Sequence, residues 1–173
     1  RFFLLFCTLI SSLLALPSDT ELKKMIGHML VVGFDEATIN AQSPIVKELR
    51  TYELGGVILF DRFYKERNRT KNISSPEQLK ELTKQLKHYA KRPLLISIDQ
   101  EGGKVARLKP SYGFAEIPSA YALSKTSLEH TKNVYTSMAQ MLKDNGINCD
   151  FGPVVDLAVN EKNSVILGLE RSY

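Results

Sequence analysis

Four short apolar runs, separated by segments with helical patterns, constrain the fold of this chain more than any other feature. The runs span residues 29–34, 57–60, 94–98 and 147–151. Between them, apolar residues recur at helical spacing, and helix-start signals such as Ser75-Pro76 precede them. Near-continuous apolar strands are typically buried on both faces of a parallel sheet, and alternation with helices favours the same arrangement. We therefore predict an α/β fold with parallel strands.

Both an open doubly wound sheet and a closed barrel fit this alternation. A dinucleotide-binding sheet requires Gly-x-Gly-x-x-Gly after the first strand, and residues 33–35 do not supply it. A barrel instead places polar side chains at many strand ends. Acidic residues follow the four runs, namely Asp35, Asp61, Asp99 and Asp156. We favour a TIM-type (β/α)8 barrel, and we expect residues 17–173 to hold about its first half, because a complete barrel needs roughly 250 residues.

Residues 1–16 form a segment of a different kind. One basic residue, Arg1, precedes about fifteen mostly apolar residues, as in a signal peptide. The run is short for a bilayer span, which needs about 20 residues. We expect a cleaved signal peptide, with an uncleaved membrane anchor as the alternative, and an exported protein of a bacterial periplasm or the extracellular space. Cleavage would leave Cys149 as the one cysteine, which excludes an intramolecular disulfide.

The charge pattern of the chain bears on the classes of molecule that it could bind. Residues 61–92 hold ten Lys and Arg against four Asp and Glu. Such a run usually forms a solvated face, and a weak attraction to anionic polymer is the alternative. The basic residues form no stripe interleaved with aromatic residues, so we expect no nucleic-acid partner. The three histidines lack metal-ligand spacing, so we expect no metal. Two N-x-S/T sequons, the acceptor sequences for N-glycosylation, begin at Asn68 and Asn72.

Two carboxylates, two glycines and two cations follow the third apolar run. Residues 93–107 read PLLISIDQEGGKVAR. The carboxyl end of a buried parallel strand is where α/β folds bind ligands. In an extended chain, Asp99 and Glu101 would point to the same side. They could contact a ligand, hold the loop by clamping Arg107, or perform acid/base chemistry.

The glycine pair and the two cations allow a further prediction. Gly102 and Gly103 permit either an ordinary tight turn or a close approach of the backbone to a ligand. A helical turn after the glycines would place Lys104 and Arg107 on one side, because the two are three residues apart.

Four sequence blocks, taken together, resemble the glycoside hydrolase family 3 N-terminal domain. They are GGVILF at 55–60, IDQEGGKVAR at 98–107, GINCDFGPVVD at 146–156 and RSY at 171–173. The chain is most similar to the bacterial β-N-acetylhexosaminidase branch of that family. The resemblance implies a TIM-type barrel and removal of terminal β-linked sugars, often N-acetylglucosamine, with retention of configuration and without a cofactor.

The resemblance also implies roles for individual residues. The substrate-binding residues would be Asp99, Arg107 and Arg171, supported by Glu101, Gly102, Gly103 and Asp156. Lys104 stands where the family commonly has Arg, and Glu170 where it commonly has Asp. The family's catalytic pair, an Asp nucleophile and a His acid/base, is expected downstream of residue 173. No catalytic residue is therefore assigned in this chain, and we expect the chain alone to be inactive.

Two alternative functions remain open after this assignment. One is a β-glucosidase or β-xylosidase of the same family, and the other is a non-catalytic sugar-binding barrel. The expected partner in the main interpretation is an oligosaccharide, such as a cell-wall fragment or a chitooligosaccharide. We expect a monomer, with no stable membrane insertion unless the leader stays uncleaved.

Overall fold

The computed structural model describes residues 16–173, so the predicted leader, apart from Leu16, lies outside the described residues. A parallel sheet organises the chain. Its strands are β1 (Val31–Gly33), β2 (Gly56–Leu59), β3 (Leu95–Ile98) and β4 (Cys149–Asp150), arranged in the order β1-β2-β3-β4. A doubly wound sheet reverses its strand order at a switch point, whereas a barrel adds each strand beside the last. The sequential order confirms the α/β fold and matches part of a (β/α)8 barrel.

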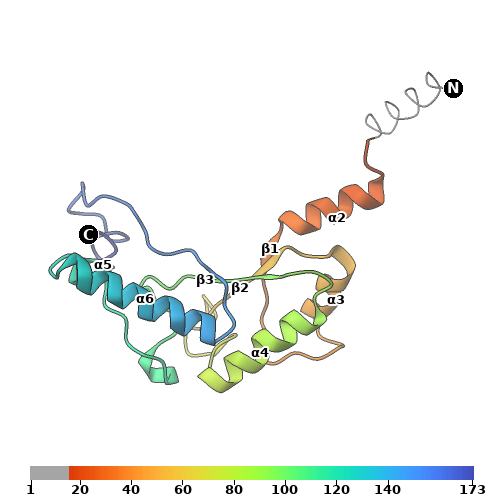
Figure 1. The fold of residues 1–173 in the computed structure, drawn as a ribbon, viewed down its shortest axis with the longest axis horizontal. Coiled ribbons are helices and arrows are strands. Elements are labelled where there is room, and N and C mark those ends of the chain that lie inside the picture. Colours follow the sequence, from red (N-terminus) through yellow and green to blue (C-terminus); the bar gives the residue numbers. More distant parts are fainter. Residues whose placement is uncertain (1–15) are drawn as a thin grey trace.

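Helices precede and connect the strands, and one of them begins at the predicted start signal Ser75-Pro76. They are α2 (Asp19–Met29), α3 (Pro44–Tyr52), α4 (Pro76–Tyr89), α5 (Ala120–Leu123) and α6 (Leu128–Asp144). Ser18 and Glu21 form a reciprocal capping box at α2, and the Ser75 hydroxyl accepts the Gln78 N–H at α4. Figure 1 shows α3, α4 and α6 on one side of the sheet, while α2 projects toward the N-terminus. Among the described helices, none has both the length and the apolar character that a membrane span requires.

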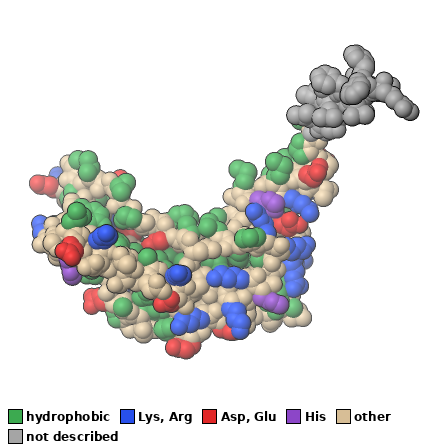
Figure 2. Space-filling view, in the orientation of Figure 1, with side chains coloured by type: hydrophobic (Ala, Val, Ile, Leu, Met, Phe, Trp, Pro, Cys, Tyr) green, Lys and Arg blue, Asp and Glu red, His purple; other side chains and the backbone are tan. Residues whose placement is uncertain are grey.

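The two faces of the sheet are buried to different degrees. Val57 and Ile96 pair in register and are fully buried in the core cluster that also contains Leu49 of α3 and Leu82 of α4. On the opposite face, Val31 is exposed, Ile58 and Leu95 are half-buried, and Ser97 is fully buried. Figure 2 shows hydrophobic side chains along the concave upper side of the molecule. Within residues 16–173, one face of the sheet is therefore buried against the helices, and the other is buried only in part.

A buried asparagine ties the loop after β2 to the end of β1. The Asn72 side chain is fully buried, and its Oδ1 accepts the Phe60 N–H at 3.0 Å. Its Nδ2 donates to the carbonyl oxygens of Phe34 at 3.1 Å and Glu36 at 2.9 Å. Both N–H donors and one of the two acceptor lone pairs of the Asn72 amide are therefore bonded to backbone groups. Asn72 therefore fixes how the chain leaves two neighbouring strands.

Candidate functional site

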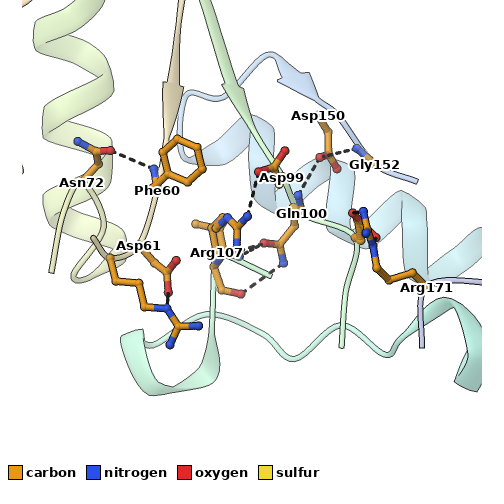
Figure 3. A network of polar contacts seen from close by, with 12 residues as sticks. Phe60, Asp61, Asn72, Asp99, Gln100, Arg107, Asp150, Gly152 and Arg171 are labelled. Carbon is orange, nitrogen blue, oxygen red and sulfur yellow. Dashed lines mark hydrogen bonds and ion pairs between the residues drawn. The ribbon is translucent and has the colours of Figure 1, made fainter. Parts of the chain in front are cut away.

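The chain turns sharply after β3, within residues 99–107, which we call the 99–107 corner (Figure 3). Arg107 Nη2 donates to Asp99 Oδ2 at 2.9 Å, and the two side chains remain 21% and 29% exposed. Since the pair uses one nitrogen of a guanidinium that carries five N–H donors, both groups keep further bonding positions. The corner therefore presents an accessible acceptor and an accessible donor side by side.

The second carboxylate of the corner has a different partner. Arg171 donates to Glu101 through Nε at 2.8 Å and through Nη2 at 2.7 Å, in a two-pronged ion pair. The side chains of Glu101 and Arg171 are 10% and 20% exposed, respectively. These hydrogen bonds raise the pKa of Arg171 above its ordinary value. The predicted clamp on Arg107 thus exists, but Asp99 makes it, while Glu101 connects the corner to a residue far along the chain.

The glycine pair forms a tight turn packed against the chain itself. Gly102 and Gly103 have φ angles of 96° and 54°, and the Val105 N–H donates to the Gly102 carbonyl at 3.2 Å. A Cβ atom on Gly102 would lie 2.2 Å from the Pro118 carbonyl oxygen. The left-handed φ and this contact both require glycine. The close approach that the glycines permit is therefore made by residues 117–119 of the same chain.

The structure has no helical turn after the glycines, so Lys104 and Arg107 are not brought to one side in that way. Residues 102–105 form a β-turn closed by a bridge between Gly102 and Val105, so Lys104 and Arg107 have separate partners. Lys104 Nζ lies 2.8 Å from Glu170 Oε1, and Glu170 Oε2 also accepts the Ser119 hydroxyl at 3.0 Å. Lys104 therefore helps to hold the segment that carries Arg171, next to the Glu101–Arg171 pair.

A buried glutamine shapes the corner, and the sequence interpretation gave it no role. Gln100 is fully buried; its Oε1 accepts the N–H groups of Arg107 at 2.9 Å and Leu108 at 3.0 Å. Its Nε2 donates to the Leu108 carbonyl at 3.3 Å. This amide brings the returning chain back to the start of the corner. Gln100 therefore places Arg107 where it can reach Asp99.

Asp150 is a second residue that the sequence interpretation missed. Its Oδ1 accepts the Gln100 N–H at 2.9 Å and the Gly152 N–H at 3.0 Å, joining the ends of β3 and β4. Burial, followed by the charges of Asp99 and Glu101, raises the pKa of Asp150, and the two backbone N–H groups act in the opposite direction. The available signal was an acidic residue within the apolar run 147–151, because such a residue needs a partner.

Asp156 lies at the margin of this group. It is exposed in an irregular segment, and its charge adds to that of Glu101 in raising the pKa of Arg171. The structure thus brings together six of the seven predicted residues, namely Asp99, Glu101, Gly102, Gly103, Arg107 and Arg171. Within the described residues, no group of three or more His, Cys, Asp or Glu side chains is placed to hold a metal ion.

Curated proteins of two bacteria match parts of this chain. A protein named Beta-hexosaminidase from Vibrio cholerae is 38% identical over 106 residues, which are 60% of this chain and 29% of that protein. A Beta-hexosaminidase from Xylella fastidiosa is 33% identical over 138 residues, which are 75% of this chain and 37% of that protein. The match therefore spans about a third of the length of these relatives.

Solved structures match more of the chain. A glycoside hydrolase family 3 beta-N-acetylglucosaminidase from Paenibacillus sp. aligns with a TM-score of 0.73 and 31% identity, over 88% of this chain and 27% of that one. NagZ from Neisseria gonorrhoeae aligns with a TM-score of 0.58 and 26% identity, over 74% of this chain and 37% of that one. Residues 21–173 match the family described as Glycosyl hydrolase family 3 N terminal domain. The chain therefore belongs to the glycosyl hydrolase family 3 N-terminal domain family.

Proposed function

We propose that this chain forms part of the sugar-binding site of an exported, retaining glycoside hydrolase that releases terminal β-linked N-acetylglucosamine. The family membership and the names of the similar proteins support the reaction class. The leader-like composition of residues 1–16 supports export to a bacterial periplasm or the extracellular space. In this proposal the substrates are cell-wall fragments or chitooligosaccharides.

The observation that carries the proposal is the accessible Asp99–Arg107 pair at the carboxyl edge of the sheet. Each sugar hydroxyl can donate one hydrogen bond and accept others. Neighbouring hydroxyls on a ring could therefore donate to the Asp99 carboxylate and accept from the Arg107 guanidinium. Hydrogen bonds to charged groups are stronger than those between neutral groups, and the existing ion pair holds both side chains in position before the sugar arrives.

Arg171 is the third proposed sugar contact, and Glu101 is its positioning residue. The two-pronged pair fixes the plane of the guanidinium and leaves it charged. Its remaining N–H groups could donate to the same sugar. The turn at Gly102 and Gly103 keeps Glu101 in place, and Asp156 contributes negative charge near Arg171.

The bond-breaking chemistry belongs to other residues in this proposal. A retaining glycosidase needs a nucleophile and an acid/base about 5 Å apart across the glycosidic bond. We propose that a downstream Asp and a downstream His of the whole protein supply them. The contribution of Asp99, Arg107 and Arg171 is to bind and orient the terminal sugar. The isolated chain should then not hydrolyse the substrate.

Hydrolysis of 4-nitrophenyl N-acetyl-β-D-glucosaminide by the whole protein tests the proposal. We expect turnover by the wild type and a kcat/KM about 100-fold lower for Asp99→Asn, because the variant loses a charged acceptor. The matched control is Asp35→Asn, which changes an exposed acid that follows β1 and should keep the wild-type value.

Three results would contradict this proposal. Wild-type kcat/KM in Asp99→Asn would remove Asp99 from the site. Preferred hydrolysis of the corresponding glucoside or xyloside would assign the protein to the β-glucosidase or β-xylosidase group. Sugar binding without hydrolysis of any of these substrates would support a non-catalytic barrel.

A further inference from the structure

We propose that a cavity beside the 99–107 corner binds a negatively charged oxygen group carried by the sugar unit next to the terminal one. The proposal rests on the proposed function, because it extends the same substrate by one unit. The cavity measures about 270 Å³ and is lined by residues of the loop after β2 together with Arg107. Since Arg107 also binds Asp99, the cavity adjoins the place proposed for the terminal sugar.

The walls of the cavity suit a sugar ring. Phe60, Phe63 and Tyr64 line it, so three aromatic rings stand beside polar groups. The guanidinium of Arg107 lies 5.5 Å from the centre of the Phe60 ring, and Lys71 Nζ lies 5.3 Å from it. Binding sites for small molecules typically combine such apolar walls with a few polar groups that fix orientation. Figure 3 shows Phe60, Asp61 and Arg107 close together at this edge of the sheet.

The charges that line the cavity favour an anion over a neutral sugar. Four of its lining residues are cations, namely Arg62, Arg67, Lys71 and Arg107, against one acid, Asp61. Asp61 is only 2% exposed and forms an ion pair with Lys109, which is not among the lining residues. The negative charge of Asp61 is therefore largely balanced by a cation from another part of the chain, and the cavity keeps a positive excess.

Three of the four cations have a partner within the chain but remain able to make further contacts. Lys71 lies 3.2 Å from Asp35, whose side chain is largely exposed, and Arg107 binds Asp99. Arg62 Nε lies 3.9 Å from Asp61 Oδ2. Arg62 and Arg67 are exposed. Arginine is suited to carboxylate, sulfate and phosphate groups because its planar fork can donate two parallel hydrogen bonds. A solvated basic loop would need neither the aromatic walls nor the shared Arg107, so the geometry points to a binding site.

The charged group could be a carboxylate or a sulfate, and substrates can distinguish them. Three disaccharides with terminal β-1,4-linked N-acetylglucosamine are compared with the whole protein: neutral chitobiose, chitobiose with a 6-O-sulfate on the reducing unit, and the disaccharide whose second unit is glucuronate. We expect kcat/KM for at least one charged disaccharide to exceed that for chitobiose about tenfold at low salt. The advantage should shrink as ionic strength rises, because exposed charges are screened.

The Arg67→Gln variant tests the named cavity. The ratio of kcat/KM between charged and neutral disaccharides should fall to about one, because the variant removes one of the two exposed guanidinium groups. Lys65→Gln is the matched control, since Lys65 is exposed in the same loop and does not line the cavity. Its ratio should equal that of the wild type. Melting temperatures of both variants check that the fold is kept.

The outcomes separate this inference from the proposed function. Equal kcat/KM for neutral and charged disaccharides in the wild type would overturn the inference alone. If the kcat/KM ratio between charged and neutral disaccharides fell equally in Lys65→Gln and Arg67→Gln, the preference would be a general effect of loop charge. That result would also overturn the inference. If the wild type fails to hydrolyse 4-nitrophenyl N-acetyl-β-D-glucosaminide, the proposed function fails. In that case, binding of the 6-O-sulfated chitobiose no tighter than binding of neutral chitobiose would overturn the cavity as well.

Discussion

The corner after β3 and the loop after β2 leave the same edge of the sheet, but they are held in place differently. In the 99–107 corner, Gln100 is fully buried, Glu101 is nearly so, and hydrogen bonds connect the segment to Ile117, Asp150 and Arg171. In residues 62–70, most side chains are exposed, and the Arg69–Glu66 pair has side chains that are 60% and 61% exposed. The corner therefore has the geometry of a preorganised site, whereas the loop contributes charge on adaptable side chains.

This difference suggests a division of roles within one binding surface. A terminal sugar that must be oriented for bond cleavage benefits from groups fixed in advance. A neighbouring unit that contributes affinity and selectivity can be bound by exposed cations, whose interactions are weaker and depend on salt. Arg107 belongs to both regions, because it binds Asp99 and also lines the cavity beside the loop.

The largest expected effect comes from opening the turn in the corner. Gly102→Ala should destabilise the protein by about 3–5 kcal/mol, because it combines a left-handed φ with a backbone contact that no side chain can relieve. Gly113→Ala is the control, since Gly113 also has a left-handed φ, of 89°, but its Cβ would lie 3.5 Å from Pro76 Cδ, an ordinary contact. It should cost about 1–2 kcal/mol. Chemical denaturation measures both, and equal losses would show that the packing of the turn contributes little.

The next largest expected effect is the difference in stability lost when the buried ion pair and the exposed ion pair are each broken. Glu101→Gln should lower the free energy of unfolding by about 2 kcal/mol. The Arg171 guanidinium is largely buried, and the variant removes the negative charge that balances it. Glu66→Gln, the same change in the loop, should cost less than about 0.5 kcal/mol. Urea denaturation of the two variants gives the comparison directly. A loss in Glu66→Gln as large as that in Glu101→Gln would contradict the contrast between corner and loop.

The smallest effect concerns Asp150 and depends on pH. Burial and the neighbouring carboxylates raise its pKa, so its contribution to stability is present at acid pH and is lost as pH rises through the folded-state pKa. Asp150→Asn keeps an oxygen that can accept both backbone N–H groups, since both bond to Oδ1. The variant should therefore gain stability relative to the wild type between about pH 4 and about pH 7, by less than about 1 kcal/mol. Urea denaturation at both pH values measures the change, and a relative loss at the higher pH would refute it.

The sequence predicted those parts of the molecule that depend on neighbouring residues. The start signal Ser75-Pro76 located α4, and an apolar run followed by polar residues located the 99–107 corner. Strand ends were less accurate: the run 29–34 became Val31–Gly33 because α2 continues to Met29, and the run 147–151 became Cys149–Asp150. Short strands depend on pairing across the sheet, which local patterns do not contain.

Partners that lie far apart in the sequence could not be assigned from spacing. The separation of Asp99 and Glu101 by two residues predicted a common side, but their partners are Arg107 and Arg171, respectively. The interval from Lys104 to Arg107 fits a helical turn and a β-turn equally well, and the left-handed glycines decide for the β-turn. The sequence therefore predicted which residues lie close together better than it predicted the contacts that they make.

The burial of Asn72 has a consequence for producing this protein in other organisms. Asn72 begins one of the two sequons, yet its amide nitrogen donates to two carbonyls inside the fold, whereas Asn68 of the other sequon is exposed. A secretory pathway that attaches oligosaccharides to nascent polypeptides would modify Asn72 before β1 and the following loop are joined, and the bulky adduct could not then enter the interior. Replacing Ser74 by alanine would remove that acceptor sequence and leave the buried amide unchanged, at the cost of the hydrogen bond from the Ser74 hydroxyl to Gln78.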